Sequence, residues 1–203
     1  MEYEQRPFGD TVFIDNPENR CPVLLLLDTS GSMQGQPIRE LNDGLTVFRD
    51  ELFADSLAAK RVEVSIVTFG PVQTIVDFTG LQTFTPPQLN ASGDTPMGRA
   101  IEQGLDLLAA RKKTYRENGI SFYRPWVFLI TDGGPTDSIS KAKELIVAGE
   151  SSKAFSMFAV GVDGANFEIL KNLSPAREPL RLQGLRFRDL FQWLSASLSS
   201  VSK

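Results

Sequence analysis

Three oxygen-bearing side chains alternate with small residues in the segment Asp28-Thr29-Ser30-Gly31-Ser32. Asp28, Ser30 and Ser32 can turn toward one point, because the residues between them let the backbone curl. Carboxylate and hydroxyl oxygens are ligands for hard cations such as Mg²⁺ and Ca²⁺. The same residue types are also common in turns and at helix N-termini. This segment alone therefore leaves a metal site and a plain turn as alternatives.

Two later segments supply further oxygen ligands. Thr95 lies in Ser92-Gly93-Asp94-Thr95-Pro96-Met97, and Asp132 directly follows the apolar run at 126–131. The chain has no histidine and a single cysteine, Cys21. These counts exclude His-ligated zinc, Cys-rich metal sites, intramolecular disulfides and Ser-His-Asp or Cys-His catalysis. A metal in this protein must therefore be a hard cation that is held by oxygen.

The hydrophobic pattern predicts the elements that would bring these residues together. Continuous apolar runs at 22–27 and 126–131 are typical of buried parallel strands, and an aspartate follows each run. Further strands are expected at 62–69, 71–78, 154–160 and 180–182. Helices are expected at 38–57, 97–110, 138–148 and 186–201.

Alternating strands and helices predict an α/β fold with a mostly parallel sheet. The strand at 71–78 follows the Gly70-Pro71 turn too closely for a crossover, so an antiparallel edge position is expected for it. Ligands of such sheets bind beyond the carboxyl ends of the strands, which is the edge where Asp28 and Asp132 would lie.

Composition limits the class of protein. The chain has 203 residues, a formal net charge of −4 and a pI near 5.0, which favours one domain and argues against a nucleic-acid binder. We expect residues 1–20 to be an N-terminal extension and 21–203 to be the core. The N-terminus lacks an apolar run, and no stretch reaches the ~18 apolar residues of a membrane span, so a cytoplasmic location is expected.

The combined pattern resembles the von Willebrand factor type A (VWA) domain. That family's metal-ion-dependent adhesion site (MIDAS) joins a DxSxS motif, a distant threonine and an aspartate that closes a later strand. The positions are matched, in the family's chain order, by Asp28, Ser30, Ser32, Thr95 and Asp132. The resemblance runs from Pro22 to the C-terminus. It implies a single three-layer, doubly wound, Rossmann-like domain, with one antiparallel edge strand and helices on both faces of the sheet.

The resemblance also implies a function. The hydroxyls of Ser30, Ser32 and Thr95 would coordinate a divalent cation directly, and Asp28 and Asp132 would do so directly or through water. Mg²⁺ is favoured, with Ca²⁺ and Mn²⁺ as alternatives. Neutral hydroxyls leave the charge of the cation partly unbalanced, so a Glu or Asp carboxylate of a protein partner could replace one bound water. We therefore expect a protein-binding module and not an enzyme.

A narrower resemblance concerns the setting. The segments 130–137 (ITDGGPTD) and 158–165 (FAVGVDGA), with Arg20-Cys21-Pro22, are similar to intracellular bacterial VWA proteins of the TerY tellurium-resistance type. This likeness implies a role in tellurium or stress resistance. The sequence indicates neither the partner's identity nor an oligomeric state.

Three alternatives compete with this hypothesis, of which a VWA scaffold that has lost metal binding is disfavoured because all five ligand residues are present. A haloacid-dehalogenase-like, Mg²⁺-dependent phosphatase would use Asp28 as nucleophile, with Asp132 and Asp137 as its late acidic pair. That family's motif needs a second aspartate two residues after the nucleophile, where this chain has Ser30. Outside that hypothesis, Asp137 is expected to cap the helix near Ser138, with a place at the rim of the metal site or against the partner as the alternative. A nucleotide-binding Rossmann domain is disfavoured because no GxGxxG or GxxxxGK[ST] follows the first strand.

Overall fold

Six strands form one mixed sheet in a computed structural model that describes residues 16–162, 164–182 and 186–201. The strand order is β3-β2-β1-β4-β5-β6, and only the β2–β3 pair is antiparallel. The strands are β1 (Cys21–Asp28), β2 (Val62–Phe69), β3 (Gln73–Gly80), β4 (Trp126–Thr131), β5 (Ser156–Gly161) and β6 (Leu180–Arg181). The predicted fold class is confirmed. Residues 1–15 of the predicted extension, and Asp163 of the TerY-like segment, lie outside the described residues.

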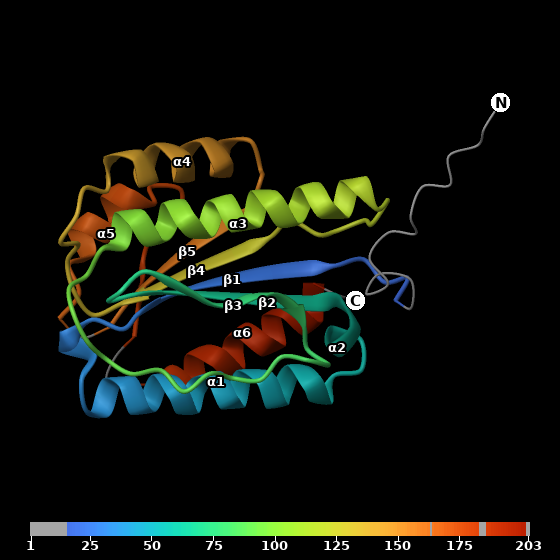
Figure 1. The fold of residues 1–203 in the computed structure, drawn as a ribbon, viewed down its shortest axis with the longest axis horizontal. Coiled ribbons are helices and arrows are strands. Elements are labelled where there is room, and N and C mark those ends of the chain that lie inside the picture. Colours follow the sequence, from blue (N-terminus) through green and yellow to red (C-terminus); the bar gives the residue numbers. More distant parts are fainter. Residues whose placement is uncertain (1–15, 163, 183–185, 202–203) are drawn as a thin grey trace, which may run out of the picture.

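Helices cover both faces of the sheet (Figure 1). They are α1 (Gln36–Ala54), α2 (Ala58–Arg61), α3 (Met97–Glu117), α4 (Ser140–Ser151), α5 (Phe167–Leu173) and α6 (Phe187–Val201), with a 3-10 turn η2 at Gly31–Met33. Helices α1 and α6 lie on one face, and α3, α4 and α5 lie on the other. Among the described helices, none is both long enough and apolar enough to span a bilayer.

Strand β1 shows why its sequence is apolar without interruption. Val23, Leu25 and Leu27 belong to the core cluster that includes α1 and α6, whereas Leu24 and Leu26 belong to the cluster beneath α3 and α4. Successive side chains of a strand point to opposite faces, so a strand covered on both sides needs apolar residues at every position. Strand β1 therefore packs against the helices on both faces of the sheet.

The register of the sheet places the expected ligands at one edge. Asp28 is the last residue of β1 and pairs with Phe69, the last residue of β2. On the other side of β1, Leu27 pairs with Ile130, so Thr131 and Asp132 follow where β1 also ends. The carboxyl ends of three neighbouring strands are therefore level, and their loops leave the sheet together.

Several boundaries differ from the predictions. Helix α3 continues to Glu117 through the charged segment after Ala110, because Lys113, Arg116 and Glu117 are exposed while Tyr115 is fully buried. Helix α1 ends at Ala54, because Asp55 turns the chain and accepts hydrogen bonds from the backbone of Leu57 and Ala58. The short elements α2, α5 and η2 were not predicted.

Candidate metal centre

A chain of hydrogen bonds joins three of the predicted ligands. The hydroxyl oxygens of Ser30 and Ser32 lie 3.0 Å apart, and Ser32 Oγ donates to Asp132 Oδ1 at 2.8 Å. Ser32 and Asp132 are one hundred residues apart in the sequence. Ser30 is buried, Ser32 is exposed and Asp132 is half-buried. The site therefore opens to solvent on the side of Ser32.

Asp28 adjoins this series of hydrogen bonds at Ser30 and is fully buried. Its Oδ1 accepts a hydrogen bond from the backbone N–H of Ser30 at 2.9 Å, and its Oδ2 accepts one from Thr131 Oγ1 at 2.5 Å. Burial raises the pKa of Asp28; the hydrogen bonds from Ser30 and Thr131 offset part of that effect, and the charge of Asp132 raises the pKa further. Among the described residues, no Lys or Arg forms an ion pair with Asp28 or Asp132.

Thr95 approaches from the loop that precedes α3. Its backbone N–H donates to Thr136 Oγ1 at 3.1 Å, and the N–H of Thr136 donates to the Thr95 carbonyl at 2.9 Å. A Cβ atom added at Gly133 would lie 3.9 Å from Thr95 Oγ1. The Thr95 hydroxyl therefore faces the loop that begins with Asp132, and the structure brings all five predicted residues to one place.

The loops that contain Gly70 and Ser92-Gly93 contact the DxSxS segment through its backbone. The N–H of Gly31 donates to the carbonyl of Gly93 at 3.0 Å, and the N–H of Ser92 donates to the carbonyl of Thr29 at 2.8 Å. Gly70 has φ +132°, and a Cβ there would lie 2.7 Å from the backbone nitrogen of Ser30. Glycine is required at this position because only it permits both the backbone angle and the close approach.

Two residues have roles that the sequence did not reveal. Thr131 was not predicted as part of the site, although a polar residue that ends the apolar run at 126–131 was a signal for it. Asp137 was expected to cap the helix near Ser138, but it does not. It accepts hydrogen bonds from the backbone of Gly98 and Arg99 at the start of α3. That prediction was wrong, because the loop after β4 folds against a helix from an earlier part of the chain.

The donor set suits a hard cation. Within the described residues, no group of three or more His, Cys, Asp or Glu side chains could hold a metal. The candidate centre therefore depends on two carboxylates and three hydroxyls, all of them oxygen donors, as Mg²⁺, Ca²⁺ and Mn²⁺ prefer.

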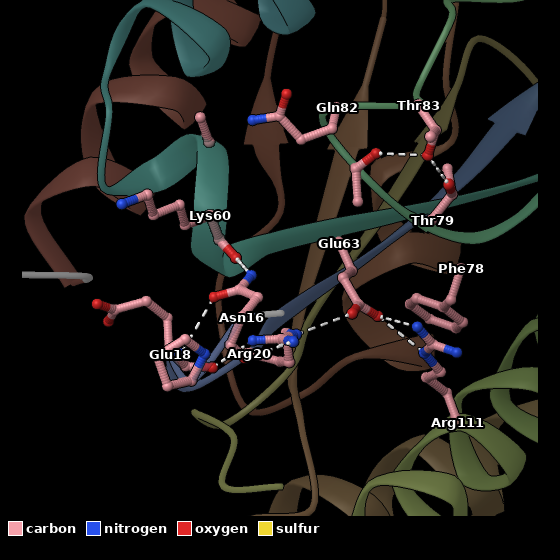
Figure 2. Close-up of a pocket in the computed structure, with 13 residues that line it drawn as sticks. Asn16, Glu18, Arg20, Lys60, Glu63, Phe78, Thr79, Gln82, Thr83 and Arg111 are labelled. Carbon is pink, nitrogen blue, oxygen red and sulfur yellow. Dashed lines mark hydrogen bonds and ion pairs between the residues drawn. The ribbon is translucent and has the colours of Figure 1, made fainter. Parts of the chain in front are cut away.

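A second buried polar cluster lies at the opposite edge of the sheet (Figure 2). Glu63, at the start of β2, is 2.6 Å from Arg111 Nη2 and 3.2 Å from Arg20 Nε, and it accepts a 2.5 Å hydrogen bond from Tyr115 Oη. Burial raises the pKa of Tyr115, and the charge of Glu63 adds to that effect. A cavity of about 630 Å³, lined in part by Glu63, Arg111 and Phe78, lies beside the cluster. The buried charge of Glu63 is thus balanced within the protein.

Comparisons with known proteins agree with this architecture. Residues 23–183 match the family model of the von Willebrand factor type A domain. The chain is 25% identical over 175 residues to human von Willebrand factor A domain-containing protein 5A, an alignment that covers 80% of this chain and 21% of that protein. The chain thus spans about a fifth of the length of this curated relative.

Solved structures share the fold at low identity. The vWF domain of the type V pili tip protein Mfa5 from Porphyromonas gingivalis has a TM-score of 0.67 and 10% identity, covering 92% of this chain and 97% of that chain. Proximal thread matrix protein 1 from the mussel byssus, with a zinc-occupied MIDAS motif, has a TM-score of 0.60 and 14% identity, covering 91% of this chain and 49% of that one.

Proposed function

Because the chain belongs to the von Willebrand factor type A domain family, we propose that it is a metal-dependent protein-binding module. The observation that carries this proposal is the buried carboxylate of Asp28, which faces the charge of Asp132 with no Lys or Arg ion-paired to either among the described residues. A buried charge is costly unless it is paired. A divalent cation bound at this place would balance both carboxylates.

The residues that would hold the cation are Asp28, Ser30, Ser32, Thr95 and Asp132. Mg²⁺ is the proposed ion, with Ca²⁺ and Mn²⁺ as alternatives, since all three accept oxygen ligands. The zinc reported for the MIDAS motif of the mussel protein supports a divalent metal in this fold. Three of the five proposed ligands are neutral hydroxyls that cannot fill every coordination position, so the bound cation would keep a water that an anionic oxygen can replace.

The proposed ligand is a Glu or Asp carboxylate of a protein partner. It would approach from the side of Ser32, which is exposed and adjoins the half-buried Asp132. We propose no bond-making chemistry. The phosphatase alternative is disfavoured because its motif needs a second aspartate two residues after the nucleophile Asp28, where this chain has Ser30. The cytoplasmic location and the tellurium- or stress-resistance setting stay predictions from the sequence.

Calorimetric titration of the chelator-treated protein with Mg²⁺, Mn²⁺ and Ca²⁺ tests the metal site. We expect one site in the wild type and in the control Asp77→Asn, which changes an exposed aspartate of β3, and no binding to Asp28→Asn. Absence of binding to the wild type would end the proposal. Equal binding by Asp28→Asn would move the site elsewhere.

A carboxylate probe tests the second half of the proposal. With Mn²⁺ bound, the methyl proton resonance of acetate should broaden in proportion to the loaded wild-type protein, because the metal keeps a position that a carboxylate can enter. Asp28→Asn at the same total Mn²⁺ gives the background of unbound metal. Tight Mn²⁺ binding without broadening of the acetate signal above that of protein-free buffer would contradict carboxylate capture while leaving the metal site intact.

A further inference from the structure

The N-terminus of α3 obtains its cap from a distant loop. Its own N-cap residue is Pro96, whose side chain makes no capping hydrogen bond, and its first turn contains no acidic residue. Asp137 replaces the missing cap: Oδ1 accepts from the N–H of Gly98 and Oδ2 from the N–H of Arg99, both at 2.9 Å. These two amides belong to the first turn of a helix, where no intrahelical acceptor exists. Asp137 therefore joins α3 to the loop after β4.

The joined segments both carry proposed metal ligands. Thr95 lies two residues before α3, and Asp132 lies five residues before Asp137. A second pair of hydrogen bonds links the same segments, because Thr95 and Thr136 exchange one bond in each direction.

The packing at this junction is close. A Cβ atom at Gly98 would lie 2.2 Å from the carbonyl oxygen of Ser138, so only glycine lets the helix approach the loop this far. The four hydrogen bonds and this contact hold the two loops as one unit. A change at Asp137 would therefore reach Thr95 and Asp132 together.

We propose that Asp137 is a positioning residue of the metal centre, which sets the separation between the Thr95 hydroxyl and the Asp132 carboxylate. This inference rests on the proposed function. Asp137 would act through the two segments that carry the ligands, because its oxygens accept hydrogen bonds from the first turn of α3. Its charge also lies at the positive end of the helix dipole, where it is favourable. Groups that hydrogen-bond metal ligands directly typically contribute about ten- to hundredfold to metal affinity. Asp137 would act through backbone amides, so we expect an effect near the lower end of that range.

Asp55→Ala is a matched control for Asp137→Ala. Asp55 Oδ1 accepts hydrogen bonds from the N–H groups of Leu57 and Ala58, at 2.9 and 3.0 Å, where α2 begins. Helix α2 precedes β2 and therefore lies at the end of the sheet opposite the metal centre (Figure 1). Each variant loses a carboxylate that accepts two backbone hydrogen bonds at the start of a helix, and the unfolding curves in EDTA compare the two losses of stability directly.

The test measures Mn²⁺ affinity, by electron paramagnetic resonance of free Mn²⁺, and the urea unfolding curve in EDTA. We expect Asp137→Ala to weaken Mn²⁺ binding by about tenfold or more, and Asp55→Ala by less than about twofold. Asp137→Asn keeps one acceptor oxygen, so it should recover part of the loss. The amide resonances of Gly98 and Arg99 should shift in the metal-free Asp137 variants and stay unchanged in Asp55→Ala.

Each result decides a different point. Equal Mn²⁺ affinity of Asp137→Ala and the wild type would overturn the positioning role alone, and so would an equal loss in Asp55→Ala. A wild type that binds no Mn²⁺ would overturn the proposed function as well. Where Asp137→Ala does not fold, Asp137→Asn decides, with an expected loss of at least about threefold.

Discussion

The sheet buries one carboxylate at each end and treats the two in opposite ways. Glu63, at the amino end of β2, is 4% exposed and lies within 3.2 Å of two guanidinium groups. Asp28, at the carboxyl end of β1, is 0% exposed, and its described hydrogen bonds come from neutral groups of Ser30 and Thr131. Among the described residues, Glu63 thus has cationic partners, whereas Asp28 has neutral hydrogen-bond donors alone.

This difference teaches how a fold separates structural charge from functional charge. A buried ion pair is complete without any other molecule, and removing one partner strands the other in a low-dielectric interior. On the proposed function, a buried carboxylate that has donors but no cation among the described residues receives a positive ion from solution. We therefore expect perturbations at the Glu63 end to act on folding alone, and those at the Asp28 end to depend on divalent metal.

The largest effect should follow from Glu63→Gln. The substitution removes the buried carboxylate that contacts Arg20, Arg111 and Tyr115, and breaking a buried ion pair in this way typically costs about 3–5 kcal/mol. Urea unfolding should show this loss equally in EDTA and in Mg²⁺. Glu117→Gln, which removes an exposed partner of Lys113, serves as control and should change the free energy of unfolding by less than about 0.5 kcal/mol. A Glu63→Gln protein as stable as the control would show that the two ends do not differ as described.

Divalent metal should act on the other end alone. At a free concentration of one hundred times the dissociation constant, a bound cation stabilises the folded wild type by about 2.7 kcal/mol. Thermal unfolding should show this gain in wild type and Glu63→Gln, and no gain in Asp28→Asn. A metal response that is lost in Glu63→Gln, but kept in Asp28→Asn, would reverse the assignment of the two ends.

The pH dependence of the metal-free protein should show the raised pKa of Asp28. Because the folded state binds this proton more tightly than the unfolded chain, the free energy of unfolding should fall as pH rises from 3.8, the ordinary value, through the raised pKa. One proton gives a slope of at most about 1.4 kcal/mol per pH unit.

Subtracting the pH profile of Asp28→Asn, measured in EDTA, isolates this contribution. In saturating Mg²⁺ the wild type should no longer lose stability as pH rises, because the cation binds the ionised carboxylate. A wild-type profile in EDTA that parallels that of Asp28→Asn, or a difference of the opposite sign, would contradict the cause assigned to the shift.

The smallest effect should come from supplying the missing cation within the chain. Ser32→Lys places an ammonium group on the exposed side of Asp132, where a partly solvated pair contributes about 0.2–1 kcal/mol. In EDTA this variant should be more stable than Ser32→Ala, and Mg²⁺ should add nothing to it. Ser200→Lys, at an exposed position near the end of α6, controls for the added charge. A Ser32→Lys protein that still gains stability from Mg²⁺ would show that Ser32 is not beside the bound ion.

Much of the fold was predictable because its signals are local. The apolar runs predicted β2 and β4 with their observed bounds, and the switch from unbroken runs to helical spacing located α1, α3 and α6. Short elements escaped prediction: α5 has seven residues and buries only Leu170 and Leu173, too few to show a period. The five candidate ligands were predictable because their types and chain order resemble a known motif.

Contacts between distant segments could not be predicted in the same way. The cap that Asp137 provides to α3 joins it to Gly98 and Arg99, which lie 39 and 38 positions earlier in the sequence. The pairing of Glu63 with Arg20 and Arg111 depends on which side chains meet at the amino edge of the sheet, and no spacing in the sequence encodes that meeting. Thr131 was partly predictable. Its position at the end of a strand could be read from the sequence, but its hydrogen bond to Asp28 could not.

The length of β1 has a consequence for how this protein can change over time. Its eight residues separate the two ends of the sheet by roughly 25 Å at about 3.3 Å per residue, well beyond the screening length of about 8 Å at physiological salt. Substitutions so far apart add nearly independently. The ion-paired residues of the amino edge could therefore change over evolution with little effect on the carboxyl edge. The loops of the carboxyl edge could likewise change with little effect on the stability that the amino edge provides.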